Sequence, residues 1–145
     1  MKIRQLSLFL ENRPGQLRVP CKILGDAGID VLTMSLADTQ QFGILRLVVK
    51  DSEAAKKALE AQGVVVNLTE LLAVDVPDRP GGLASVLEGF EKAGLSVEYM
   101  YPFARGPRAT LLFRVEDPER AEKALSQHGV QLVPAAELLA RTAAR

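Results

Sequence analysis

The chain has 145 residues, of which 48% are hydrophobic and 25% charged, and its 18 basic residues balance its 18 acidic ones. This composition excludes a disordered chain and, without a basic excess, argues against a nucleic-acid partner. Uncharged apolar runs fall far short of the roughly 18–20 residues that a membrane span needs, so no membrane association is expected. The N-terminus lacks the apolar core of a signal peptide, and the single cysteine forms no internal disulfide. Together these features predict a reducing, cytoplasmic location.

The first half of the chain has apolar residues that alternate in some segments and recur at helical spacing in others. Residues 2–10 alternate as in a strand, and the turn Arg13-Pro14-Gly15 leads into a helical stripe that ends near Gly28. Asp51 is expected to cap a second helix. The predicted elements are a strand (2–10), a helix (17–28), two strands (29–37 and 43–50), a helix (51–63) and a strand (64–68).

The second half of the chain repeats the first half at an offset of 66 residues, without a gap. Arg13-Pro14-Gly15 returns as Arg79-Pro80-Gly81, and Lys57-Ala58-Leu59 returns as Lys123-Ala124-Leu125. The predicted elements are a strand (71–76), a helix (82–93), two strands (95–103 and 110–115), a helix (118–127), a strand (130–133) and a helical tail (135–144).

Each copy therefore has the order β-α-β-β-α-β, the ferredoxin-like pattern. The sequence predicts an α+β protein of two such domains in tandem, each an antiparallel sheet with helices on one face. The expected domains are residues 1–69 and residues 70–145, the second with a short C-terminal helical tail.

Cysteine and histidine, which bind zinc and serve in many nucleophilic catalysts, each occur once in this chain. One Cys and one His fall short of the three or four ligands of a zinc site, so no metal and no cofactor are expected. The pattern predicts that His128 lies at an exposed helix end and that Cys21 is a small buried hydrophobe. A carboxylate enzyme that uses Glu11 with Asp78 is the remaining catalytic hypothesis, but no acid, base and nucleophile occur together. The sequence therefore favours a non-catalytic binding protein.

Two loops with an Asn or Asp before Arg-Pro-Gly follow the first strand of each repeat, at Asn12-Arg13-Pro14-Gly15 and Asp78-Arg79-Pro80-Gly81. Each repeat also enters its second strand with Gly-apolar-polar-apolar, from Gly28 and from Gly94. In these features the chain resembles the ACT-domain family of small-molecule regulatory modules over nearly its whole length. It is similar in kind to the small regulatory subunits of amino-acid biosynthetic enzymes.

The resemblance implies an amino-acid ligand bound at the interface between ACT units, a homodimer, and an enzyme of amino-acid metabolism as partner. Asn12 and Asp78 either cap the helices that follow or bond the ligand's ammonium group, and both interpretations stay open. Gly15 and Gly81 are needed for the turn in either case, and they let backbone N–H groups approach a carboxylate. The predicted ligand contacts of the loops are Asn12, Arg13, Pro14, Gly15, Gln16, Leu17, Asp78, Arg79, Pro80, Gly81, Gly82 and Leu83.

The second strand of each repeat supplies the other predicted contacts. The polar residue after the helix is often Asn in ligand-binding members, whereas here it is Asp30 in the first repeat and Ser96 in the second. The two potential sites are therefore expected to be unequal, and whether one or both repeats bind stays open. Tyr99 and Tyr101 share one strand face and Met100 lies on the other, and a tyrosine pair can wall a pocket, which favours the second repeat. The same tyrosines could instead form an exposed sheet face or a dimer contact.

The favoured function is a cytoplasmic amino-acid sensor that a partner enzyme reads. The alternative is an interaction module that has lost its ligand and that dimerises or holds a partner enzyme, an interpretation that Asp30 in place of Asn motivates. Arg105 and Arg108 are expected to be solvated turn charges.

Overall fold

The computed structural model describes residues 2–141 and divides them into two compact units, each with the predicted mixture of helices and antiparallel strands. One unit comprises residues 4–69. The other runs from Glu70 onward and includes the first residues of the chain up to Ile3. No helix within 2–141 is long and apolar enough to cross a lipid bilayer.

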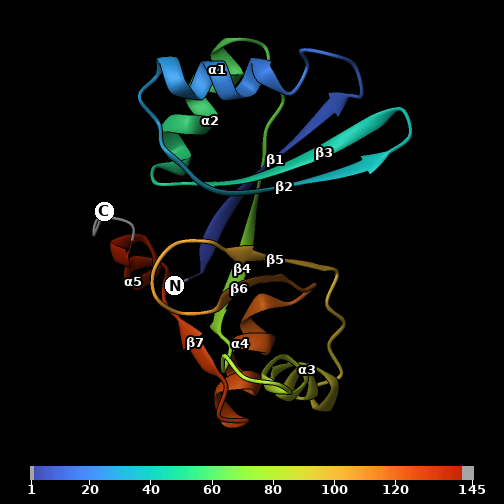
Figure 1. The fold of residues 1–145 in the computed structure, drawn as a ribbon, viewed down its shortest axis with the longest axis vertical. Coiled ribbons are helices and arrows are strands. Elements are labelled where there is room, and N and C mark those ends of the chain that lie inside the picture. The colour runs from blue at the N-terminus through green and yellow to red at the C-terminus, as the bar shows by residue number, and fades with distance from the viewer. Residues whose placement is uncertain (1, 142–145) are drawn as a thin grey trace. The chain divides into compact units, whose positions relative to one another are not determined.

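The first unit has its strands in the order β2-β3-β1, and all neighbouring strands are antiparallel. Its register pairs Leu8 of β1 with Leu45 of β3, and Leu45 in turn with Leu36 of β2. Helices α1 and α2 lie together against one face of this sheet (Figure 1). The elements are β1 (Ile3–Glu11), α1 (Arg18–Asp26), β2 (Val31–Thr39), β3 (Phe42–Val49), α2 (Ser52–Ala61) and the start of β4 (Asn67–Asp75).

The second unit repeats this plan with strands in the order β7-β4-β6-β5, again antiparallel. It continues from β4 through α3 (Gly82–Lys92), β5 (Tyr99–Phe103), β6 (Thr110–Arg114), α4 (Pro118–Gln127), β7 (Gln131–Val133) and α5 (Ala135–Ala140). The predicted α+β class with two β-α-β-β-α-β units is thus confirmed. Of the predicted helical tail, residues 142–145 lie outside the described residues.

Strand β4 differs from the prediction. Two strands, 64–68 and 71–76, were expected, whereas one continuous strand runs from Asn67 to Asp75. The physical reason is visible in the sequence, since no Gly or Pro interrupts the chain between Gly63 and Pro77. The end of the first repeat and the start of the second therefore share one strand.

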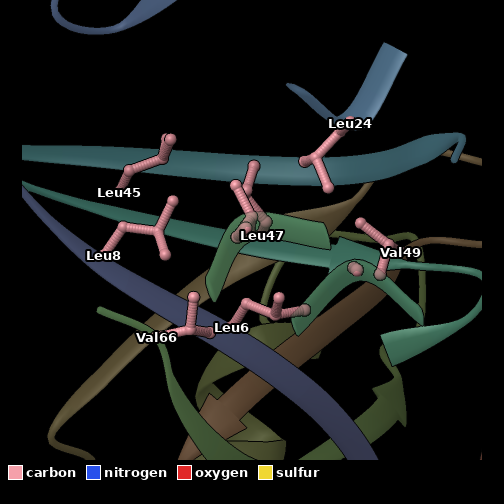
Figure 2. Packing of buried hydrophobic residues seen from close by; sticks show 9 residues of the cluster. Leu6, Leu8, Leu24, Leu45, Leu47, Val49 and Val66 are labelled. Carbon is pink, nitrogen blue, oxygen red and sulfur yellow. The ribbon is translucent and has the colours of Figure 1, made fainter. Parts of the chain in front are cut away.

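The cores of the two units are built from equivalent positions of the two repeats. In the first unit, Leu6 and Leu47 of the sheet gather with Leu24 of α1 (Figure 2). The positions 66 residues later are Leu72, Phe113 and Phe90, and they form the second core. The rings of Phe90 and Phe113 lie 4.9 Å apart between centroids. Residues that lie 66 positions apart in the sequence thus occupy equivalent places in the two cores.

Helices α2 and α4 begin at equivalent caps, as predicted for Asp51. The Asp51 carboxylate accepts a bond from the Ala54 N–H at 3.0 Å, and the Asp117 carboxylate accepts one from the Arg120 N–H at 3.1 Å. We expect Asp51→Ala and Asp117→Ala each to lower the free energy of unfolding by about 1 kcal/mol, because one helix N–H loses its partner. Urea unfolding followed by circular dichroism measures the loss. The matched variants Asp51→Asn and Asp117→Asn keep an acceptor oxygen, so losses as large as those of the alanine variants would contradict this account.

Candidate functional site

The loop between β4 and α3 folds into a tight turn at the predicted Pro-Gly motif of the second repeat. The Arg79 N–H donates to the Pro77 carbonyl at 2.9 Å, and the Gly82 N–H donates to the Arg79 carbonyl at 3.0 Å. Gly81 has φ +85°, a conformation that L side chains rarely adopt. Gly82 is packed so closely that a Cβ there would lie 2.0 Å from the Pro77 carbonyl oxygen. The motif residues thus fix the path of the backbone into α3.

This loop forms one wall of a groove of about 500 Å³ in the second unit. Asp78 and Arg79 stand on the loop, and Arg108 comes from the β5–β6 hairpin. The groove therefore combines one carboxylate and two guanidinium groups with largely apolar walls. The apolar lining comprises Val76, Pro77, Pro80, Leu83, Pro102, Phe103, Ala109 and Leu111, and Thr110 adds a hydroxyl.

A buried polar cluster lies next to the groove. Asp75 is 8% exposed, and its two carboxylate oxygens accept bonds from the Arg141 guanidinium, both at 2.9 Å. Thr110 Oγ1 donates to Asp75 Oδ1 at 2.6 Å, and Arg108 Nη1 lies 3.7 Å from Asp75 Oδ2. Asp75 and Thr110 alternate along their strands with core residues such as Val74, so they face away from α3 and α4. Arg141 follows α5, which places this helix end against that opposite sheet face.

Burial alone would raise the pKa of Asp75, because it disfavours the charged carboxylate. The hydrogen bonds from Arg141 and Thr110 outweigh that effect, together with the charges of Arg141 and Arg108, and hold the pKa below its ordinary value of 3.8. The same carboxylate raises the pKa of the Arg141 guanidinium. Asp75 is therefore an ionised anchor for two arginines.

The lowered pKa of Asp75 sets a direction for the pH dependence of stability. A carboxylate with a depressed folded-state pKa contributes stability that is fully present above its unfolded pKa. The contribution is lost as the pH falls from about 4 through the lower folded-state pKa. We expect the stability difference between the wild type and Asp75→Asn to be largest at neutral pH and to shrink toward pH 3. Urea unfolding at several pH values measures it, and a difference that grew on acidification would contradict the assignment.

The equivalent loop of the first repeat is built differently. Gly15 has φ +87°, like Gly81, but α1 begins only at Arg18. The Asn12 side chain donates to the Gln40 carbonyl at 3.3 Å, and Arg13 forms an ion pair with Glu11. The N-cap positions of α1 and α3 are held by Leu17 and Gly81, so neither Asn12 nor Asp78 occupies the N-cap of its helix.

The remaining predicted contacts of the second strands do not line the groove: Asp30 belongs to the first unit, and those of the second repeat lie elsewhere in the second unit. Asp30 is exposed after α1, and Ser96 lines a separate hollow of about 540 Å³ with Glu98, Glu116 and Arg120 among its walls. Tyr99 and Tyr101 stack with ring centroids 6.4 Å apart, and Tyr101 is only 5% exposed. The structure thus brings Asp78, Arg79, Pro80 and Leu83 together at one groove, and it does not bring Ser96, Tyr99, Met100 or Tyr101 to it.

Sequence reasoning missed Asp75, Arg141 and the position of Arg108. Arg108 is 63% exposed, as a turn charge should be, yet it lines the groove and reaches Asp75. One signal was available for Asp75, a lone carboxylate within the apolar run Leu71-Leu72-Ala73-Val74-Asp75-Val76. His128 lies at the C-cap of α4 as predicted, and Cys21 is partly rather than fully buried. Within residues 2–141, no three His, Cys, Asp or Glu side chains are grouped so that they could hold a metal ion.

Comparison with known proteins gives the same architecture. A family model described as an ACT domain pair matches residues 1–141. The crystal structure of protein BT0572 from Bacteroides thetaiotaomicron is similar with a TM-score of 0.88 and 34% sequence identity, covering 96% of each chain. No curated protein matches the sequence.

Two regulatory subunits of aspartate kinase share the fold at low identity. The subunit from Thermus flavus has a TM-score of 0.61 and 18% identity, covering 89% of this chain and 94% of its own. The subunit from Thermus thermophilus, in its ligand-free form, has a TM-score of 0.64 and 18% identity, covering 88% and 91%. At this identity the likeness concerns the fold.

Proposed function

Because the chain belongs to the family of ACT domain pairs, we propose that it is a non-catalytic regulatory protein that binds an amino acid. The observation that carries the proposal is the groove at the start of α3, where a carboxylate and two guanidinium groups line largely apolar walls. A partner enzyme of amino-acid metabolism recognises the ligand-bound form of the protein and responds to it. The fold shared with regulatory subunits of aspartate kinase supports this kind of partner.

The charges of the groove match the two charged ends of an amino acid. The Asp78 carboxylate suits the ligand's ammonium group, and the guanidinium groups of Arg79 and Arg108 suit its carboxylate. The N-terminal end of α3 adds a favourable partial charge for the carboxylate. Apolar walls such as Leu83 and Phe103 then suit an uncharged side chain.

A thermal-shift screen of the full chain against the twenty amino acids, followed by calorimetry, tests the proposal. At least one amino acid is expected to raise the melting temperature, since a ligand that binds the folded state stabilises it. Asp78→Asn is expected to weaken binding roughly 10- to 100-fold, as for the loss of a hydrogen bond to a charged group. Glu91→Gln is the matched control, because Glu91 is an exposed carboxylate of α3 that does not line the groove. Binding by no amino acid, or equal binding by both variants, would refute the proposal.

A second candidate is an interaction module without a ligand, favoured by exposed aromatic residues of the first unit. Phe9 is 65% exposed and Phe42 is 50% exposed, and they lie on neighbouring antiparallel strands β1 and β3. Exposed aromatic groups of this kind are typical of contact surfaces. The expected homodimer stays a prediction, tested by light scattering of the wild type and of Phe9→Ser/Phe42→Ser. A dimer that the double substitution dissociates would favour the module, and an unchanged mass would count against it.

A further inference from the structure

Arg108 faces two anionic partners, one of them buried in the protein and the other expected in the groove. Its guanidinium lies 3.7 Å from the buried Asp75 carboxylate and also lines the groove beside Asp78. The Arg108 side chain is 63% exposed and makes this single longer contact with Asp75. Arg141 approaches the same carboxylate with two bonds of 2.9 Å and is only 13% exposed. One carboxylate is therefore shared by an exposed arginine at 3.7 Å and a largely buried arginine that contacts it through two bonds.

We propose that Arg108 couples occupancy of the groove to the docking of α5 on the second unit. The coupling to a ligand rests on the proposed function, whereas the competition of Arg108 and Arg141 for Asp75 does not. In the empty state, Arg108 partly neutralises Asp75 and repels Arg141. A ligand carboxylate that binds Arg108 draws it toward the groove, and Asp75 then depends on Arg141 alone. Docking of α5 becomes more favourable as a result.

The contacts of α5 make it suited to respond. The helix has six residues, and Ala135 and Leu138 are its buried side chains. Its end is fixed to the sheet through Arg141, which also bonds Glu137 Oε1 at 2.9 Å. When this end leaves the sheet, Arg108 can move fully onto Asp75 and out of the groove. By linkage, the factor by which a ligand raises the equilibrium constant for docking of α5 equals the factor by which docking raises ligand affinity. Leu138 is buried when α5 is docked and exposed when it is undocked, so a partner can bind one of these two states in preference to the other.

Amide hydrogen exchange of the full chain tests the competition without any ligand. The amides of Leu138 and Arg141 are the reporters, because they bond the Pro134 and Glu137 carbonyls within α5. Arg141→Gln is expected to speed their exchange, since the bidentate contact is lost. Arg108→Gln is expected to slow it by roughly two- to fivefold, the range of an exposed ion pair. Arg79→Gln is the control, since Arg79 lines the groove while the structure pairs Asp75 with Arg108 and Arg141.

The outcomes separate the two proposals. Exchange in Arg108→Gln that is unchanged, faster, or equal to that in Arg79→Gln would overturn the competition, whatever binds the groove. If the exchange results are as expected but no amino acid binds the wild type, the competition stands and the amino-acid proposal fails. If an amino acid binds the wild type without slowing α5 exchange, the ligand proposal stands and the coupling is overturned. If an amino acid binds and slows α5 exchange equally in the wild type and in Arg108→Gln, the coupling through Arg108 is overturned while the ligand proposal stands.

Discussion

Gly82→Ala is expected to destabilise the second unit by about 1–3 kcal/mol or more and to abolish ligand binding in the groove. The added Cβ would lie 2.0 Å from the Pro77 carbonyl oxygen and 3.0 Å from its carbon, and neither is the movable end of a side chain. The turn itself must therefore shift, and Asp78 and Arg79 shift with it. The backbone of Gly82 does not have a positive φ, so the effect isolates the steric contact from backbone strain.

Gly25→Ala provides the matched control for this substitution. Gly25 lies within α1, and a Cβ there would meet nothing within 4 Å. Alanine in a helix is favoured over glycine by roughly 0.5–1 kcal/mol, so a small gain in stability is expected. Chemical unfolding together with calorimetry measures both properties. A Gly82→Ala protein as stable as the wild type, with ligand binding intact, would show that the close turn does not shape the groove.

Phe113→Ala is expected to lower the free energy of unfolding of the second unit by about 3–5 kcal/mol. Phe113 is fully buried and packs its ring against Phe90, so its removal leaves a cavity and ends an aromatic contact. Phe113→Leu is expected to cost less, because Leu47 fills the equivalent position of the first core. Equal losses in the two variants would contradict this account, because they would mean that leucine recovers none of the packing that the ring provides.

The chain offers a selective probe for this measurement. It has no tryptophan and only two tyrosines, Tyr99 and Tyr101, and both lie on β5 of the second unit. Tyrosine emission therefore follows the second unit, while far-ultraviolet circular dichroism follows the helices of both units. The tyrosine transition is expected to move to lower denaturant concentration in Phe113→Ala. A variant whose tyrosine transition did not move would contradict the core assignment.

The fold could be predicted from the sequence because the duplication repeats the core positions and helix caps that determine each unit. Core positions such as Leu6 and Leu72, or Leu59 and Leu125, occur at the offset of 66 residues and occupy equivalent places. The caps Asp51 and Asp117 recur for the same reason. The continuous strand β4 was not anticipated, because a repeat boundary suggested a break where no Gly or Pro makes one.

The candidate site was predictable only where local backbone chemistry decides it. The Pro-Gly motif indicated the turn and therefore Asp78 and Arg79, since a positive φ at Gly81 is a local property. The contribution of Arg108 depends on the path of the β5–β6 hairpin. The Arg141–Asp75 contact joins residues 66 apart and depends on where α5 returns to the sheet. Such contacts follow from tertiary packing, which no local pattern expresses.

The central claim is that the groove at Asp78 and Arg108 is an amino-acid site of the second repeat. Nuclear magnetic resonance of the ¹⁵N-labelled full chain, titrated with the amino acid that gives the largest thermal shift, tests it most directly. The account predicts that the amide signals of Gly81, Gly82 and Arg108 move with ligand concentration, while those of Gly15 and Gln16 in the first repeat stay in place. Signals that move in the first-repeat loop, with Gly81, Gly82 and Arg108 unchanged, would contradict it.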